Sequence, residues 1–316
     1  MSISTLPTRR RKSRLRFTQT NRQLAVMALP GVIVLFVMSY LPLVGLVLAF
    51  KNYVAFDGIW KSPWVGFDNF EFLFRTKAAQ HITVNTLLMN SLFIVTTLSA
   101  SLFIAILLNE IRLTSRYLSR FYQTSLFFPF VISWVIVSFF AFALLDSEGG
   151  LVNQALAAVG GHPVSFYSEP GYWHTILVIT NLWKSVGFFT IIFLAGIVAI
   201  NPEYLEASLL DGASKAKQVR FVILPLIAPL IVVNFLLMLS RIFYADFGLF
   251  FNVPRNQGLL YPATDVIDTY VFRGLITTGD VGMAAAAGLY QAIFGFLLVV
   301  SVNWVIRRTA PERALF

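Results

Sequence analysis

The sequence predicts an all-α integral membrane protein with six transmembrane helices. Of its 316 residues, 57% are hydrophobic and only 12% are charged, and the mean hydropathy is +0.75. A soluble domain of this length needs far more polar surface, so the composition places the chain in the membrane class. Six apolar runs are each long enough to cross a hydrocarbon layer of about 30 Å. These runs cover residues 24–50, 82–108, 122–145, 174–200, 225–247 and 281–306.

The first run follows a basic tail, residues 1–23, which holds seven Lys and Arg residues and no acid. A cleaved signal peptide also begins with basic residues, but its apolar core is short. The run 24–50 has about 27 residues, so we interpret it as a membrane anchor. Pro30 and Pro42 lie within it, and a span tolerates them because neighbouring helices can satisfy the freed carbonyls.

The distribution of basic residues predicts that both termini are cytoplasmic. The loops 51–80, 146–173 and 248–280 alternate to the outside and together carry about six Lys and Arg, against about sixteen in the segments placed inside. The membrane domain therefore covers residues 24–308, and residues 309–316 form a short cytoplasmic tail.

The remaining composition excludes several functions. The net charge of +9 is concentrated at the two ends beside apolar runs, where membrane orientation explains it better than nucleic-acid binding. Because there is no cysteine, neither a disulfide framework nor a thiolate metal site is possible. His81, His162 and His174 are too scattered along the sequence to indicate a metal cluster.

A polar island, residues 201–224, separates the fourth and fifth apolar runs. Asn201-Pro202-Glu203 has the features of a helix start: an Asn cap, Pro at the first position and an acid in the first turn. Gly212 suits the position just past a helix end, and Ser214 can cap a second short helix. Pro225 then stands at the start of the next apolar run. The island is thus predicted to be a helix, a glycine turn and a second helix.

Three pieces of this island, Glu206-Ala207-Ser208, Asp211-Gly212-Ala213 and Leu224-Pro225, resemble the cytoplasmic loop signature of importer permeases in the ATP-binding-cassette class. The family pattern has Ala where this chain has Ser208, a residue small enough for the same close packing. The alternative is an ordinary amphipathic loop that matches a short pattern by chance. The resemblance implies a coupling helix over Glu206–Arg220 that docks on an ATPase. The ATPase-coupling residues would be Glu206, Ala207, Ser208, Asp211, Gly212, Ala213 and Pro225.

The two acids of this pattern have a second interpretation. Glu206 and Asp211 can make charge-assisted contacts with a partner protein, or they can pair within the chain with Lys215, Lys217 or Arg220.

The resemblance also implies the type I importer permease fold and a set of partners. These are a second homologous permease, an ATPase dimer and an extracytoplasmic solute-binding protein, in a bacterial or archaeal cytoplasmic membrane. The sequence has no phosphate-binding Gly-x-x-x-x-Gly-Lys-Ser/Thr loop, so ATP and Mg²⁺ would be bound by the partner ATPase. We expect this chain to bind no cofactor or metal and to be a transport subunit rather than an enzyme.

Other segments resemble sugar permeases, nearest to the polysaccharide or aldouronate branch. In the first external loop, Gly66 is followed by Asn69 and Phe70 in a Gly-x-x-Asn-aromatic pattern, although an aromatic belt at the membrane surface is an alternative. Residues 264–271 and 282–291 resemble the end of such permeases. The resemblance implies an oligosaccharide substrate.

Charged and polar residues within the apolar runs are candidates for the substrate path. Lys184 and Arg241 lie inside spans, where a charge costs about 2.5–3.5 kcal/mol on insertion scales. Arg241 can alternatively extend to the headgroups, and a single polar residue in a span is often a helix-packing residue. Two cations suggest the hypothesis of an acidic, uronate-type oligosaccharide. The candidates are Asn181, Trp183, Lys184, Asn234, Arg241, Tyr244, Tyr290 and Gln291.

Three other functions are alternatives to this interpretation. An ion-gradient-driven secondary transporter usually has inverted repeats and mid-membrane carboxylates, and neither is found in this sequence. A permease of the same class for a non-sugar solute remains an alternative. A membrane enzyme needs clustered acids or histidines near one face; Asp265 and Asp268 are a faint candidate, which we interpret as loop solvation.

Overall fold

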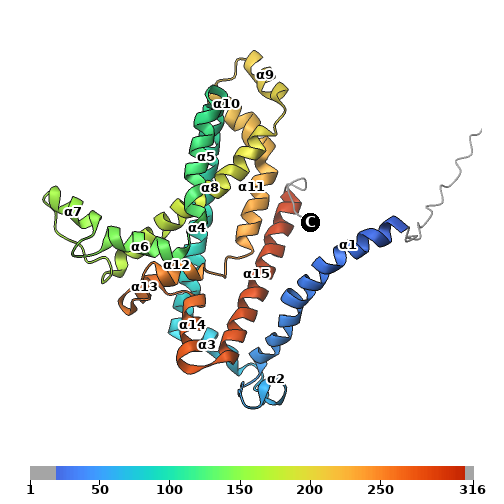
Figure 1. Cartoon of the computed structure of the whole chain (residues 1–316), viewed down its shortest axis with the longest axis vertical. Coiled ribbons are helices and arrows are strands. Elements are labelled where there is room, and N and C mark those ends of the chain that lie inside the picture. The colour runs from blue at the N-terminus through green and yellow to red at the C-terminus, as the bar shows by residue number, and fades with distance from the viewer. Residues whose placement is uncertain (1–18, 310–316) are drawn as a thin grey trace, which may run out of the picture. The chain divides into compact units, whose positions relative to one another are not determined.

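The computed structural model describes residues 19–309, which form two units, one ending at Val47 and the other beginning at Leu48. Most of the predicted basic tail and residues 310–316 lie outside the described residues. Within residues 19–309 the chain is helical, and its only β pairing is an isolated bridge between Lys51 and Trp64 (Figure 1). The prediction of an all-α fold is confirmed.

A single apolar helical stretch of mixed type contains the described part of the first unit and continues to Phe50. It begins as α1 (Gln19–Leu35), passes through a π-helical turn (Phe36–Tyr40) and continues as a 3-10 segment (Leu41–Phe50). Pro42 has no N–H to donate to the helical ladder, and the helix type changes around it. The stretch Arg22–Phe50 is long and apolar enough to cross a membrane.

Asn69 of the Gly-x-x-Asn-aromatic pattern holds the chain where this apolar segment ends. Its side-chain amide nitrogen donates to the carbonyl oxygens of Leu48 (3.3 Å), Ala49 (3.0 Å) and Lys51 (2.9 Å). The pattern therefore has a structural role, satisfying carbonyls that the end of a helix leaves without partners.

The second unit contains four further helices that are long and apolar enough to span a membrane. In this unit α4 packs along α8 and α5, and the 25-residue helix Lys215–Leu239 packs against α4, α8 and α15. The spanning elements are α4 (Lys77–Thr114), α8 (Trp173–Val198, within the span Pro170–Val198), α15 (Val281–Thr309) and the continuous run of α10 (Lys215–Gln218), a π-helical turn (Val219–Ile223) and α11 (Leu224–Leu239).

The predicted span 122–145 is not one straight helix. It is formed by α5 (Arg116–Val131) and α6 (Trp134–Leu145), which are bent by 99° at the break between them. Ser133 caps the new helix through the N–H of Ile136. Counting this bent pair as one span gives six in the described residues. An apolar run predicts that a segment is removed from water, but it does not predict where the helix axis bends.

The predicted span 225–247 also differs, because α11 ends at Leu239. The non-helical segment Ser240–Asp246 follows, and the Asp246 carboxylate accepts from the N–H of Leu249 to start α12 (Phe247–Asn252). Ser240, Arg241 and Asp246 lower the hydropathy across this break. The predicted span included them because isolated polar residues are tolerated within spans, so its end was placed too late.

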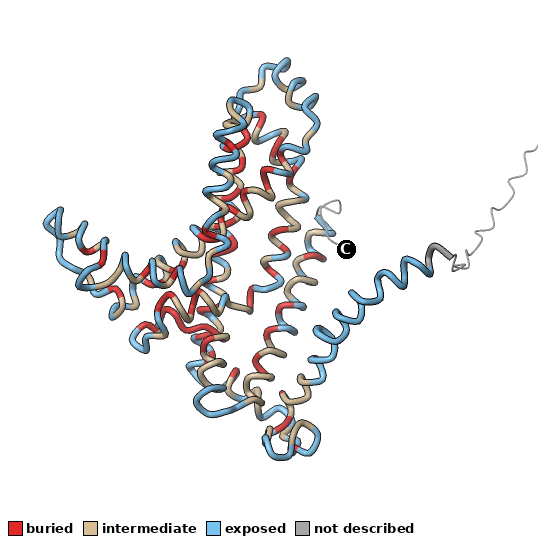
Figure 2. The backbone as a smooth tube through the Cα atoms, in the orientation of Figure 1, coloured by how far each residue is buried: buried red, intermediate tan, exposed pale blue. Residues whose placement is uncertain are grey.

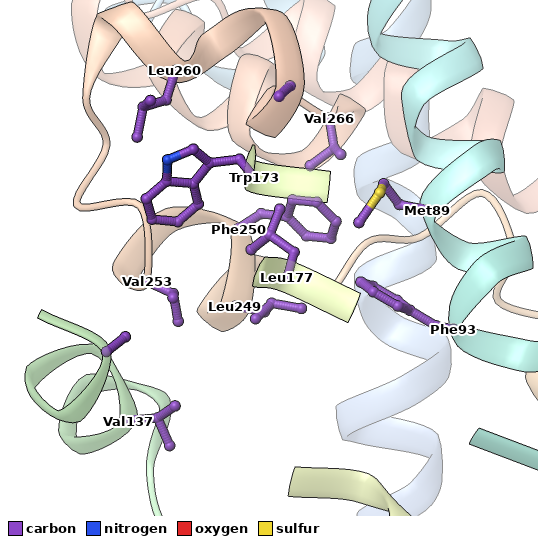
Figure 3. Close-up of a cluster of buried hydrophobic side chains, with 12 residues drawn as sticks. Met89, Phe93, Val137, Trp173, Leu177, Leu249, Phe250, Val253, Leu260 and Val266 are labelled. Carbon is purple, nitrogen blue, oxygen red and sulfur yellow. The ribbon is translucent and has the colours of Figure 1, made fainter. Parts of the chain in front are cut away.

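The main core lies where α4, α6, α8 and α12 meet, and Figure 3 shows its side chains. Trp173 is fully buried there and donates its ring N–H to the carbonyl of Phe166 at 2.7 Å. The other short helices are α2 (Gly58–Lys61), α3 (Glu71–Arg75), α7 (Leu151–Ala158), α9 (Pro202–Leu210), α13 (Tyr261–Thr264) and α14 (Ile267–Thr278), with 3-10 turns at Asp68–Phe70, Pro170–Tyr172 and Gly258–Leu260.

Gly187 allows α8 to touch the backbone of α5. A Cβ atom at this position would lie 1.9 Å from the carbonyl oxygen of Leu126, and a backbone atom cannot rotate away. Small residues permit this close approach between membrane helices.

We expect Gly187→Ala to lower the stability of the purified protein by about 1–3 kcal/mol, the usual cost of overpacking. Thermal unfolding in detergent measures it. Gly288→Ala in α15 is the matched control, since no atom lies within 4 Å of its added Cβ. Equal melting temperatures for both variants would contradict the close α5–α8 contact.

Candidate functional site

The polar island begins with α9, whose first turn is capped as the sequence predicts. The Asn201 side-chain oxygen accepts from the N–H of Glu203 at 3.1 Å, and Pro202 occupies the first helical position. The Asn201 amide also donates to the Glu203 carboxylate at 3.1 Å. A nine-residue helix is marginal on its own in water, so these contacts help to fix its start.

The end of α9 is closed by a Schellman motif. The N–H of Gly212 bonds the carbonyl of Leu209 (3.0 Å), and the N–H of Ala213 bonds that of Ser208 (2.9 Å). Gly212 adopts φ +73°, a conformation that a side chain strains. The predicted glycine turn is therefore where the structure places it.

Ser208 joins α9 to the membrane helix that follows. Its hydroxyl donates to the carbonyl of Leu205 at 2.7 Å and accepts from the side-chain amide of Gln218 at 2.9 Å. Gln218 is only 4% exposed and stands at the end of α10. The departure from the family's Ala thus adds a hydrogen bond between the two helices of the island.

The helix at the position of the predicted coupling helix, α9 (Pro202–Leu210), does not extend over Glu206–Arg220. It ends at Leu210, and Lys215 already belongs to the spanning helix Lys215–Leu239. This arrangement places α9 at one end of the second unit, beyond α10 (Figure 1). Pro225 is the second residue of α11.

Much of α9 is open to solvent (Figure 2). Glu206, Ala207 and Asp211 are exposed, and none of the ion pairs in the described residues involves either acid. Lys215 instead pairs with Glu110 at the end of α4, at 3.0 Å. The alternative of pairing within the island is therefore wrong for Lys215. Apolar side chains are exposed beside the acids: Tyr204, Leu209 and Leu210.

A second feature is a cavity of about 500 Å³ between α4, α8 and the segment Ser240–Asp246. Three of the predicted substrate-path residues, Asn181, Arg241 and Tyr244, line it together. Its wall also carries Asn90, Thr97, Ser185 and Asp246, which were not selected from the sequence. Asn90 was detectable as one of two amides in the apolar run 82–108, the other being Asn85.

The cavity contains one basic and one acidic side chain in its lining. Arg241 and Asp246 are both exposed, and the Asp246 carboxylate accepts from the ring N–H of Trp134 at 2.8 Å. The Asp246 carboxylate also caps α12, and none of the ion pairs in the described residues involves Arg241.

Lys184 does not line this cavity. Its ammonium group donates to the carbonyl oxygens of Phe130 (2.8 Å), Pro129 (3.2 Å) and Ile132, where α5 ends. It also lies 5.1 Å from the centre of the Trp134 ring, and the residue is 7% exposed. All three donors of an ammonium can be used in this way, so Lys184 caps the broken helix and the structure does not place it in the solute path.

The other four predicted residues also lie outside this cavity. The Asn234 amide donates to the carbonyl of Leu230 in its own helix at 2.8 Å, and the Tyr290 ring contacts the Phe294 ring in a tilted arrangement. Trp183 is largely exposed. Gln291 is buried and donates to the carbonyl of Phe243 at 2.7 Å.

The interpretation of Asp265 and Asp268 as loop solvation is wrong. Asp265 is buried, accepts from the hydroxyl of Thr269 and pairs with Arg273 at 2.5 Å. Burial raises the pKa of the Asp268 carboxyl, while hydrogen bonds from the N–H of Ala245 and from a side-chain amide counteract this rise. Both acids tie α14 to its neighbours.

Comparison with known protein families decides the class. Residues 97–311 match the model of the binding-protein-dependent transport system inner membrane component. The chain belongs to this family of permeases. Membership decides against the ion-gradient alternative, and the presence of several apolar spanning helices agrees with a multi-pass membrane protein.

Relatives match over almost the full length of the permease. The protein LplB of Bacillus subtilis (strain 168) is 31% identical over 298 residues, covering 92% of this chain and 91% of the relative. The polygalacturonan/rhamnogalacturonan transport system permease protein YteP of the same organism is 31% identical over 294 residues. The match covers 92% of this chain and 89% of that relative. A chain of a bacterial transporter that imports the acidic polysaccharide alginate superposes with a TM-score of 0.83 at 30% identity, covering 92% of this permease and 97% of that chain.

We expect Lys184→Met to lower the stability of the permease by about 1–3 kcal/mol, because carbonyls at the end of α5 lose their donor. Thermal unfolding in detergent gives this loss, with Trp183→Met as the control on the same helix. Uptake of acidic and neutral oligosaccharides should fall equally. A loss confined to acidic solutes would instead place Lys184 in the solute path.

Proposed function

We propose that this permease forms half of the translocation pathway of an ATP-driven importer of oligosaccharides, with acidic sugars as the preferred solutes. A second homologous permease, an ATPase dimer that binds ATP and Mg²⁺, and an extracytoplasmic solute-binding protein complete the assembly. The observation that carries the proposal is the geometry of the helix Lys215–Leu239, which joins the exposed α9 at one end to the cavity-lining segment at the other.

This helix gives the ATPase a mechanical route to the cavity. Its 25 residues correspond to about 37 Å at 1.5 Å per residue. At one end, Ser208 and Gln218 join it to α9. At the other end it continues directly into Ser240–Asp246. A movement of α9 on closure of the ATPase is thereby transmitted along a stiff element to the residues around the solute.

The exposed surface of α9 suits docking on a second protein. Leu210 is 91% exposed and, with Tyr204 and Leu209, offers apolar anchors. Glu206 and Asp211 have no ion-pair partner among the described residues and offer charge-assisted contacts at the rim. An apolar centre with polar neighbours is the usual composition of a protein interface.

The acidic character of the solute is supported by Arg241 and by the relatives. Arg241 lies in a cavity whose other polar groups are amides, hydroxyls and the carboxylate of Asp246, which accepts from the ring N–H of Trp134. Amides and hydroxyls are groups that bind sugar hydroxyls. The alginate transporter carries an acidic polysaccharide and is solved with a pentasaccharide-bound periplasmic protein, and YteP is named for polygalacturonan. Carboxylate-bearing oligosaccharides are thus the solutes that this cavity fits best.

Reversing the charge on the exposed face of α9 tests the coupling. We expect Glu206→Lys to reduce ATP-driven uptake at least about tenfold, because a charge-assisted contact contributes about 1.5–3 kcal/mol. Uptake in proteoliposomes that contain the whole complex measures the effect, and membrane insertion should be unchanged. Glu148→Lys makes the same charge change in the loop before α7 and serves as the control. Normal uptake by Glu206→Lys would contradict docking through α9.

Removing the cation from the cavity tests the solute class. We expect Arg241→Gln to slow transport of an oligouronate about tenfold or more while a neutral oligosaccharide of equal length is affected less, because only the uronate loses a charge-assisted hydrogen bond. Initial uptake rates of both solutes give the ratio. Arg241→Lys keeps the charge and should retain most of the preference; an unchanged ratio in Arg241→Gln would contradict acidic solutes.

A further inference from the structure

The cavity-lining segment Ser240–Asp246 has backbone groups that no helix satisfies. It lies between the end of α11 and the start of α12, and Ile242 and Phe243 within it are each 7% exposed. Buried carbonyls without a donor are costly, most of all in a protein that spans a membrane. Their partners therefore decide which conformation the segment can hold.

Side-chain amides from two spanning helices supply these donors. Asn90 of α4 donates to the carbonyl oxygens of Ile242 (2.8 Å) and Tyr244 (3.2 Å). Gln291 of α15 donates to that of Phe243 at 2.7 Å. Three successive carbonyls of the segment are thus bound from two sides.

A carboxylate from α14 completes the arrangement. The Asp268 oxygen Oδ2 accepts from the N–H of Ala245 at 2.8 Å and from the amide of Gln291 at 3.2 Å. Gln291, itself only 4% exposed, therefore joins the segment to Asp268 with a single amide group. The three side chains come from α4, α14 and α15, so the conformation of the segment depends on how these helices are placed.

We propose that Asn90, Asp268 and Gln291 are positioning residues that hold Ser240–Asp246 in its cavity-lining conformation, and so direct Arg241 and Tyr244 toward the transported solute. This inference rests on the proposed function for the identity of the solute. Asn234 offers a contrast: it is equally buried, but its amide bonds only the carbonyl of Leu230 in its own helix. Its removal leaves the segment untouched.

The chain contains no cysteine, so a single introduced thiol reports on the segment. In an Ile242→Cys background, the whole complex in proteoliposomes is treated with a small charged methanethiosulfonate reagent. We expect Gln291→Leu and Asn90→Leu to raise the reaction rate about tenfold, since one unpaired buried carbonyl shifts an opening equilibrium by roughly that factor. Asn234→Leu is the matched control and should remain within about twofold of the parent. An unchanged rate in Gln291→Leu, or an equal rise in Asn234→Leu, overturns the proposal.

A second readout separates positioning from general packing. In a background with native Ile242, Gln291→Leu should reduce the ratio of oligouronate to neutral uptake toward that of Arg241→Gln. Asp268→Asn, which keeps an oxygen acceptor, should retain the ratio that Asp268→Leu loses. Faster labelling with an unchanged uptake ratio overturns the link to the solute. If Gln291→Leu does not assemble, Asn90→Leu decides in the same way.

The labelling does not require transport, so its outcome is independent of the proposed function. Suppose that the parent complex moves no oligosaccharide while its Gln291→Leu variant labels faster than the parent. That result contradicts the proposed solute class but supports the proposal that Gln291 positions Ser240–Asp246.

Discussion

The constraint on which this structure depends is that every backbone polar group inside a membrane needs a partner within the protein. The spanning helices meet it through their own hydrogen-bond ladders. At three of the places where a helix ends within the described residues, side chains with several donors bind the carbonyl oxygens. Asn69 covers the end of the first apolar segment, Lys184 the end of α5, and Asn90 with Gln291 the segment after α11. These polar residues are in the membrane domain because the helices are interrupted.

The same constraint explains which of the polar residues are left for a solute. A side chain whose donors are occupied by carbonyls, as in Lys184, has little left to offer a sugar. Arg241 and Asn181 line the cavity, and neither side chain is among those that donate to the backbone carbonyl oxygens at these helix ends. In the proposed function, the segment after α11 contributes Arg241 and Tyr244 to the lining of the solute cavity.

The sequence predicted the fold class, the positions of most apolar spans and the glycine turn at Gly212, since hydropathy and local capping residues determine these features. It did not predict the bend between α5 and α6, because Ile132 and Ser133 resemble the residues of the helices around them. It did not predict the early end of α11 either, because isolated polar residues such as Ser240 and Arg241 also occur within spans. The selection of Lys184 beside Arg241 followed from depth in the membrane alone, and depth does not indicate which partner a charge has. Ser208 was treated as a neutral replacement, yet its hydroxyl accepts from a glutamine ten positions later, a pairing that no local pattern indicates.

The apolar end of α9 bears on how such a subunit is produced. Leu210 and its neighbours Tyr204 and Leu209 are uncovered in the single chain. In the proposed assembly, a chain synthesised in excess of its ATPase displays this apolar surface to the cytosol, where chaperones and proteases recognise exposed apolar groups. Balanced synthesis of permease and ATPase covers the surface, so the proposed docking helix would also mark incomplete assembly.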